Sequence, residues 1–164
     1  MTNQKNQPQK NKHGFTIIEV VLVLAIAGLI FLMVFIALPA LQRSQRDTQR
    51  RQNYANLSAA IISAATNNNG KMIATGTPSA TTYLGASMNQ DPSGTPYGKL
   101  KVVDLNASGA AVTNPSAATD NFMHVYTKAY CNNSGKPTKD GNAKHFAIYG
   151  YLESGGFYCY SGSI

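Results

Sequence analysis

Hydrophobic and polar residues are separated along the chain rather than mixed. From Val20 to Leu41 every residue except Gly28 and Pro39 is apolar, and no charged residue lies between Glu19 and Arg43. The uncharged run Val20–Leu38 spans about 30 Å as a helix, which is the thickness of the hydrocarbon core of a bilayer. The run is too long for a secretory signal peptide, and the chain after Leu41 is too alanine-rich to bury a helix that is apolar on every face. The pattern therefore predicts a transmembrane helix.

After the apolar run the sequence turns polar, but helical spacing continues. Arg43, Arg46 and Arg50 share one helical face. Asp47 lies four residues from both Arg43 and Arg51, a spacing that favours ion pairs along a helix. We expect this stretch to be exposed to solvent.

A stripe of larger and smaller apolar residues follows at helical spacing, and it consists of Tyr54, Leu57, Ile61 and Ala64. The stripe predicts that the second half of the helix packs on a domain. The Asn-Asn-Asn-Gly sequence at 67–70 supplies residues that tolerate the left-handed conformation of a helix end. We therefore expect one helix over about 15–66, in which Pro39 is a candidate bend.

The rest of the chain predicts a small sheet. Residues 71–98 are rich in Thr, Ser, Ala, Gly and Pro and predict a long connection. Four strand-like runs follow, separated by turn residues: Lys99–Leu105, Phe122–Tyr130, Lys144–Leu152 and Phe157–Tyr160. In the second run, one face carries Phe122, His124, Tyr126 and Lys128, and the other carries Met123, Val125 and Thr127. The expected fold class is α+β, with a small antiparallel β-sheet of about four strands, arranged as a meander, packed on the amphipathic half of the helix.

The net charge of +7 does not describe a basic binding face. Three lysines precede the apolar run and four arginines follow it directly. From Asn53 to the end, seven lysines stand against five acidic residues, which argues against a strongly basic nucleic-acid-binding surface. Six tyrosines from Tyr126 to Tyr160, with Lys128 and Lys144 nearby, are of the type that stacks on single-stranded nucleic acid, but positions in a core or on a sheet explain them more simply.

The boundary ahead of the apolar run carries the most specific motif, His13-Gly14-Phe15-Thr16-Ile17-Ile18-Glu19. A hydrophilic basic leader ends at Gly14, an aromatic residue follows, and a lone carboxylate stands at the fifth position after the glycine. In these features the chain resembles the type IV prepilin family, whose members have the pilin fold. That family's leader is cut after the glycine and the new amino-terminal phenylalanine is N-methylated, which the resemblance assigns to Gly14 and Phe15. Pro39 lies about one helical turn beyond the proline of many family members, so the position of a helix kink does not transfer.

The resemblance implies a cytoplasmic leader and an exported carboxyl-terminal domain, first as a single-pass protein of the inner (cytoplasmic) membrane and then in an extracellular pilus. It implies five segments: a cleaved leader (1–14), a transmembrane and assembly helix (15–41), an amphipathic helix (42–66), an αβ-loop (67–98) and a sheet with a disulfide-bounded carboxyl-terminal region (99–164). The implied partners are other copies of the chain, a prepilin peptidase, an assembly ATPase, a platform membrane protein and, before assembly, membrane lipid.

Glu19 is expected to have a partner. A carboxylate in lipid costs about 2.5 kcal/mol or more, and cleavage after Gly14 creates an ammonium group at Phe15. If helices pack side by side with an axial offset, Glu19 of one copy neutralises the Phe15 amine of its neighbour, which predicts a role in subunit assembly. The alternative is that Glu19 lies at the membrane interface and pairs with its own amino terminus or with water.

Cys131 and Cys159 are the only cysteines. In an exported domain an even pair predicts a disulfide, and many type IV pilins have a disulfide-bounded carboxyl-terminal region. Free thiols and a metal site are the alternatives.

No residues predict catalysis or a cofactor. His124 and His145 lack a companion serine or cysteine motif and are expected to be ordinary histidines of the sheet surface. Asp140-Gly141-Asn142 lacks the other ligands of a calcium loop and predicts a hairpin turn. We therefore expect a structural filament subunit that is not an enzyme and has no cofactor and no metal. The alternatives are a pseudopilin of a type II secretion system and an anchored single-pass domain that binds DNA or another ligand without polymerising.

Overall fold

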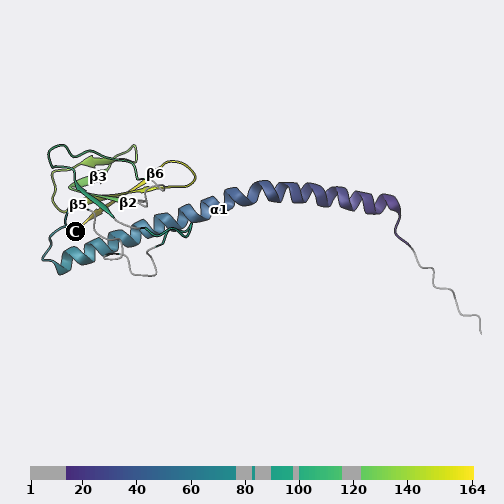
Figure 1. The fold of residues 1–164 in the computed structure, drawn as a ribbon, viewed down its shortest axis with the longest axis horizontal. Coiled ribbons are helices and arrows are strands. Elements are labelled where there is room, and N and C mark those ends of the chain that lie inside the picture. Colours follow the sequence, from purple (N-terminus) through teal and green to yellow (C-terminus); the bar gives the residue numbers. More distant parts are fainter. Residues whose placement is uncertain (1–13, 77–82, 84–89, 98–99, 116–122) are drawn as a thin grey trace, which may run out of the picture. The chain divides into compact units, whose positions relative to one another are not determined.

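The computed structural model describes residues 14–76, 83, 90–97, 100–115 and 123–164 (Figure 1). The chain divides into two compact units, residues 1–40 and 41–164. The first unit contains the amino-terminal part of a long helix. The second unit, which we call the head, contains the remainder of that helix, a four-stranded sheet and a two-stranded sheet.

Helix α1, Ile17–Asn67, is 51 residues long and continues through Pro39. It ends at the expected cap. Asn69 and Gly70 have positive φ angles of 53° and 74°, and the Gly70 amide donates a 2.8 Å hydrogen bond to the Ala65 carbonyl. The prediction of one helix over about 15–66 is confirmed, with small differences at both ends.

The main sheet has the strand order β1-β2-β5-β6. Its strands are β1 (Lys101–Asp104), β2 (Met123–Thr127), β5 (His145–Tyr151) and β6 (Phe157–Ser163). Strands β2, β5 and β6 pair antiparallel as expected. The short strands β3 (Ala129–Cys131) and β4 (Pro137–Lys139) form a separate antiparallel hairpin. The predicted α+β fold class, with a long helix packed on a four-stranded sheet that is mostly antiparallel, is therefore confirmed.

The predicted meander is wrong at its first step, because β1 runs parallel to β2, with Val102 opposite Val125. A meander would join these strands by a short turn. The sequence instead provides a long connection between Asp104 and Met123, enough for the chain to return to the other end of the sheet. The starts of two predicted runs, at Lys99 and Phe122, lie outside the described residues, as do residues 77–82, 84–89 and 98 of the predicted connection 71–98.

The predicted strand Phe122–Tyr130 is divided at Lys128, which has a φ of 54° and separates β2 from β3. The backbone there is held on both sides: the Lys128 amide donates to the His145 carbonyl at 2.8 Å, and its carbonyl accepts the Asp140 amide at 2.7 Å. These bonds and a 2.7 Å ion pair between the Lys128 ammonium and Asp104 stabilise a conformation that a side chain ordinarily disfavours. Alternation of residue types cannot reveal such a break, because alternation continues on both sides of it.

The four-stranded sheet of the head has a cluster of buried side chains on each of its two faces. On the α1 face, Tyr54, Leu57 and Ile61 pack with strand residues such as Val125 and Ile148. The opposite face buries a second cluster: Leu105, Tyr126, Ala129, Ala147 and Tyr149. The predicted separation of odd and even residues in β2 is therefore confirmed. The last residue of the predicted helical stripe was wrong. Ala65 is fully buried, whereas the predicted Ala64 is only partly buried.

Tyr54 fixes the approach of α1 to the sheet. Its hydroxyl donates a 2.7 Å hydrogen bond to the Tyr151 carbonyl, and a Cβ atom at Gly150 would lie only 2.1 Å from the Cζ atom of the Tyr54 ring. The absence of a side chain at Gly150 therefore lets the ring lie against the backbone of β5.

Gly150→Ala is expected to lower the free energy of unfolding by about 2–3 kcal/mol, because the buried ring has no free space to enter. Denaturant unfolding of the full chain in detergent measures the change. Gly141→Ala is the matched control, since no atom lies within 4 Å of a Cβ at that position. Equal stability of the two variants would show that the contact between helix and sheet does not depend on Gly150.

Candidate processing and assembly site

The bond between Gly14 and Phe15 lies just ahead of α1, in exposed chain. Thr16 caps the helix: its Oγ1 accepts the Glu19 backbone N–H at 3.3 Å, and its carbonyl accepts the Val20 N–H, also at 3.3 Å. The Thr-x-x-Glu spacing of a capping box carries this signal in the sequence, although hydrophobic periodicity alone does not find it. The helix begins only after this cap, so the bond that processing would cut lies in non-helical backbone.

Phe15 and Glu19 line one shallow hollow on the same flank of α1, together with Val20, Val23 and Leu24. Both groups are exposed, Phe15 to 84%. The structure thus brings two of the predicted site residues together within one chain. Pairing of Glu19 with its own amino terminus and pairing with that of another copy are both compatible with this placement.

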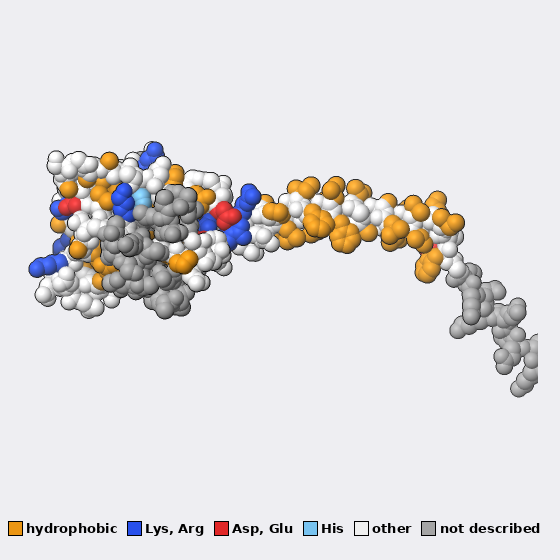
Figure 2. Space-filling model, in the orientation of Figure 1, with side chains coloured by type: hydrophobic (Ala, Val, Ile, Leu, Met, Phe, Trp, Pro, Cys, Tyr) orange, Lys and Arg blue, Asp and Glu red, His pale blue; other side chains and the backbone are white. Residues whose placement is uncertain are grey.

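The apolar part of α1 has no cover within its own unit. Its large side chains are exposed to between 44% for Val34 and 85% for Ile17, and Figure 2 shows apolar side chains all along it. The most apolar 18-residue window of α1 has a mean hydropathy of 3.2, and none of it is buried. Among the described residues, α1 is the one helix long and apolar enough to cross a membrane. So much exposed apolar surface requires lipid or other apolar helices around it.

The family described as the prokaryotic N-terminal methylation motif matches residues 9–35, a segment that contains Gly14, Phe15 and Glu19. The chain carries a prepilin-type signal. Type IV pilins and pseudopilins, which are structural proteins, share this signal, and the helix-on-sheet arrangement of the chain is pilin-like. No curated protein and no solved structure matches the chain significantly.

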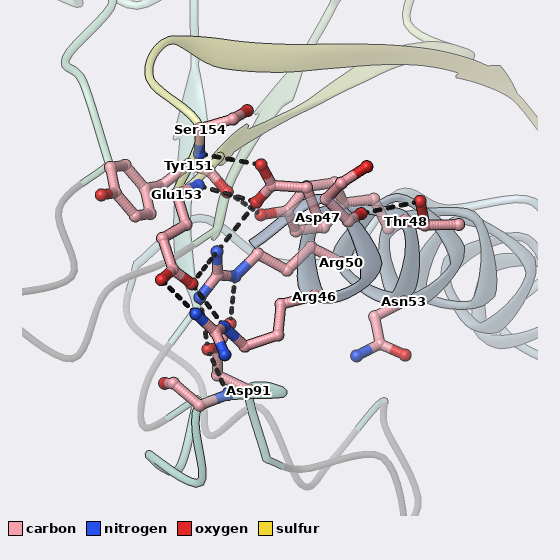
Figure 3. A network of polar contacts seen from close by, with 12 residues as sticks. Arg46, Asp47, Thr48, Arg50, Asn53, Asp91, Tyr151, Glu153 and Ser154 are labelled. Carbon is pink, nitrogen blue, oxygen red and sulfur yellow. Dashed lines mark hydrogen bonds and ion pairs between the residues drawn. The ribbon is translucent and has the colours of Figure 1, made fainter. Parts of the chain in front are cut away.

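In the head, Arg46, Asp47 and Arg50 of α1 belong to a largely buried ion-pair network (Figure 3). The Arg50 guanidinium donates two hydrogen bonds to the Asp91 carboxylate, at 2.6 and 2.7 Å. Arg46 makes a similar two-bond contact with Glu153, at 2.7 and 2.5 Å. Paired bonds between guanidinium and carboxylate groups are among the stronger side-chain contacts. They attach α1 to the loop at 90–97 and to the turn between β5 and β6.

Asp47 completes the network from the same helix. Its Oδ1 accepts the Glu153 backbone N–H at 2.7 Å and a hydrogen bond from Arg50 at 2.9 Å, and its Oδ2 accepts the Ser154 backbone N–H at 2.8 Å. Figure 3 shows the Asp47 carboxylate directed at this turn. Asp47 is only 4% exposed and Arg50 only 2%.

The expectation of a solvated stretch is therefore wrong at Asp47 and Arg50. Among the described residues Asp47 pairs with Arg50 rather than with Arg43 or Arg51, and the Arg51 guanidinium lies over the Tyr158 ring, 5.3 Å from its centroid. Helical spacing counts only neighbours on the same helix. The remaining partners of Asp47 and Arg50 come from segments 41 and 106 residues away, which no local pattern records.

The network keeps its carboxylates ionised. Burial by itself raises the pKa of Asp91, but the hydrogen bonds from Arg50 outweigh burial and hold that pKa below its ordinary range. The pKa of Asp47 is lowered in the same way, against burial, by hydrogen bonds from the β5–β6 turn and from Arg50. The hydrogen bond from Arg46 lowers the pKa of Glu153.

Because these pKa values are lowered by folding, the carboxylates stabilise the head above the ordinary carboxyl pKa of about 4, and this stability is lost as the pH falls below it. We expect the unfolding midpoint of the full chain in detergent to fall by about 5 °C or more between pH 7 and pH 3. Between pH 7 and pH 3 the unfolding midpoint of Arg50→Met should fall by less than that of the unsubstituted chain. The midpoint of the exposed control Arg43→Met should fall by the full amount. The same acid response in Arg50→Met and in the unsubstituted chain would contradict this role of the network.

The histidines do not form a catalytic group with the residues that the structure describes. His124 is 3% exposed, so its predicted place on the sheet surface is wrong; its Nδ1 lies 2.9 Å from the Thr113 carbonyl, and burial lowers its pKa. His145 contacts the Asp140 carboxylate through Nδ1 and Asn142 through Nε2. No cluster of three metal-ligating side chains occurs in the described ranges.

The tyrosines and cysteines take structural positions in the head. Tyr126 and Tyr149 are buried in the second core and are not accessible for stacking on nucleic acid. Cys131 of β3 and Cys159 of β6 form a disulfide, with 5.8 Å between their Cα atoms. Free thiols and a metal site at this pair are therefore excluded.

Proposed function

We propose that the chain is the structural subunit of a cell-surface filament. A prepilin peptidase cuts the bond after Gly14 and methylates the new amino terminus at Phe15. Before cleavage and assembly the chain spans the cytoplasmic membrane once, with its leader in the cytoplasm and its head exported. An assembly ATPase and a platform membrane protein then transfer it from lipid into a polymer of its own copies.

The proposal rests chiefly on an exposed apolar helix that carries one carboxylate near its start. That carboxylate, Glu19, lies four residues after Phe15, the amino terminus that processing would create. Helices of other copies can replace lipid around such a surface without exposing it to water. In a bundle of parallel copies, Glu19 gains the Phe15 amine of a neighbour, so two charges that are costly in an apolar medium become one pair. The Thr16 cap supports the same proposal, because it leaves the cut bond outside the helix.

A pseudopilin of a type II secretion system is the second candidate, since the same signal and the same physics apply to it. The disulfide between Cys131 and Cys159 favours a pilin over it. An anchored domain that binds DNA or another ligand and never polymerises is the third candidate.

Electron microscopy of material sheared from cells that express the chain separates the three. The proposal predicts long filaments that an antibody against the head decorates. Short assemblies that stay in the periplasm would support a pseudopilin, and chain that remains in the membrane without any assembly would support the anchored domain.

A further inference from the structure

Strand β6 forms one edge of the main sheet, with β5 as its neighbour in that sheet. Just beyond one end of β6, the Ile164 amide donates to the Lys144 carbonyl at 3.0 Å. Just beyond the other end, the Leu152 amide donates to the Gly156 carbonyl at 3.2 Å. Hydrogen-bonded pairs alternate along an antiparallel ladder, so the even-numbered residues of β6 bond to β5. The backbone N–H and C=O groups of the odd-numbered residues therefore point away from β5, along the outer edge: Phe157, Cys159, Ser161 and Ser163.

These outward backbone groups have no hydrogen-bond partner in the part of the chain that the structure describes. The opposite edge of the sheet is closed, because Val102 of β1 exchanges two backbone hydrogen bonds with Gly76, at 2.8 and 2.9 Å. Strand β1 also carries two charged residues, Lys101 and Asp104. Strand β6 has no charged residue and no proline, which are the usual features that prevent an edge strand from pairing with another chain. The β6 edge is therefore free to accept a further strand.

An exposed aromatic ring and an open hollow lie at opposite ends of this edge. Phe157, at the start of β6, is 37% exposed, and its ring centroid lies 5.2 Å from that of Tyr149. Near the other end is an open hollow, which we call the β6 hollow, lined by Tyr130, His145, Ser161, Gly162 and Ser163. Residues directly opposite each other in a ladder share a face of the sheet, and odd-numbered residues of β5 are opposite odd-numbered residues of β6. The ring of Phe157 and the β6 hollow therefore lie on the same face.

A second copy of the chain matches this edge. Phe157 and Ser163 each lie three residues from Tyr160, on either side of it. When two β6 strands pair antiparallel about Tyr160, Phe157 of each copy stands opposite Ser163 of the other, and Cys159 stands opposite Ser161. Every outward N–H and C=O group of β6 then has a partner. Because Ser163 lines the β6 hollow, each Phe157 ring reaches the hollow of the other copy, and a two-fold axis produces both insertions at once.

From this geometry we infer that the head binds a second copy of itself edge to edge, through antiparallel β6 strands centred on Tyr160, with Phe157 of each copy in the β6 hollow of the other. The two four-stranded sheets then form one continuous sheet. Pairing of identical strands brings no like charges together, because β6 has no charged residue. The contact uses residues of the head alone, so it does not rest on the apolar helix or on the proposed polymerisation.

Cysteine cross-linking tests the contact and its register. The full chain with Tyr160→Cys is purified in detergent and oxidised, and the linked peptides are mapped by mass spectrometry. At the two-fold axis this residue faces its own counterpart, with Cα atoms about 4.5 Å apart, which a disulfide can bridge. In the control, Ser163→Cys, the two cysteines are about 20 Å apart along the paired strands. We expect at least a fivefold higher yield of cross-linked dimer from Tyr160→Cys than from the control. Equal yields from the two variants, or no dimer from either, would overturn the inference.

Further substitutions in the Tyr160→Cys chain test the ring and the hollow. Phe157→Ser is expected to lower the yield of dimer at least fivefold, because it removes the apolar ring that fills the β6 hollow. Val112→Ser is the matched control, since Val112 is 38% exposed, and it should leave the yield unchanged. Ser163→Lys places a charge at an exposed position of the hollow and should lower the yield as strongly as Phe157→Ser. An unchanged yield in either Phe157→Ser or Ser163→Lys would contradict the inference. A lack of filaments in the electron microscope would contradict only the proposed function.

Discussion

Glu19→Ala is expected to leave membrane insertion and cleavage intact and to lower the yield of filaments at least tenfold. Removing one partner of a buried ion pair costs about 3–5 kcal/mol, because the other charge stays behind without compensation. In the proposed filament that charge is the amine of Phe15. The variant should therefore accumulate in the membrane as processed subunit. Immunoblots of membrane and sheared fractions, from cells with equal total subunit, measure the distribution.

The structure provides a control for this experiment. The helix cap uses the backbone N–H of Glu19, so it survives in Glu19→Ala, whereas Thr16→Ala removes the cap and keeps the carboxylate. Loss of the cap alone costs about 1 kcal/mol of helix stability. We expect Thr16→Ala to assemble much better than Glu19→Ala. Normal filament yield from Glu19→Ala would favour the alternative in which Glu19 pairs with its own amino terminus or with water.

Replacing both cysteines with serine is expected to lower the free energy of unfolding of the head by about 3.5 kcal/mol on the chain-entropy account. The disulfide joins the β3–β4 hairpin to β6 across a sequence separation of 28 residues. Without it, the hairpin keeps a hydrogen bond from the Cys131 amide to the Ser161 hydroxyl, at 2.8 Å, and its contacts with the second core. Guanidinium unfolding of the full chain in detergent, with and without a reducing agent, measures the difference.

Reduction supplies the internal control. The reducing agent should destabilise the unsubstituted chain and leave the double serine variant unchanged. Ser161→Ala, which keeps the disulfide but removes the hydroxyl that accepts the Cys131 amide, should cost only about 1 kcal/mol. A loss of less than about 1 kcal/mol on removing the disulfide would show that the hairpin is held by packing alone.

The features that the sequence predicted correctly are set by neighbours in the chain. The end of α1 follows from Asn69 and Gly70, whose residue types tolerate positive φ angles. The alternation between Val125 and Tyr126 follows from the geometry of a strand, which sends successive side chains to opposite faces. Such signals act over a few residues and need no knowledge of the fold.

The features that were predicted wrongly depend on contacts between distant segments. Arg50 looked solvated because its partner Asp91 comes from a loop that has no periodic pattern. The parallel pairing of β1 with β2 depends on the path of the chain after Asp104, which residue types do not specify. Lys128 adopts a positive φ because His145 and Asp140 hold its backbone from both sides. In each case the deciding partner is identified only once the fold is known.

The functional residues also differ in whether local sequence reveals them. Gly14, Phe15 and Glu19 could be identified as candidates from sequence, because they lie within one short local motif. The ion-pair network could not, because it is assembled from α1, the loop at 90–97 and the β5–β6 turn.

Mass spectrometry of the subunit in sheared filaments tests the central claim most directly. The account predicts a chain that begins at Phe15, with one additional methyl group on its amino terminus and an intact disulfide between Cys131 and Cys159. A subunit that still begins at Met1, or one cut beyond Leu41 and therefore without the apolar helix, would contradict the account.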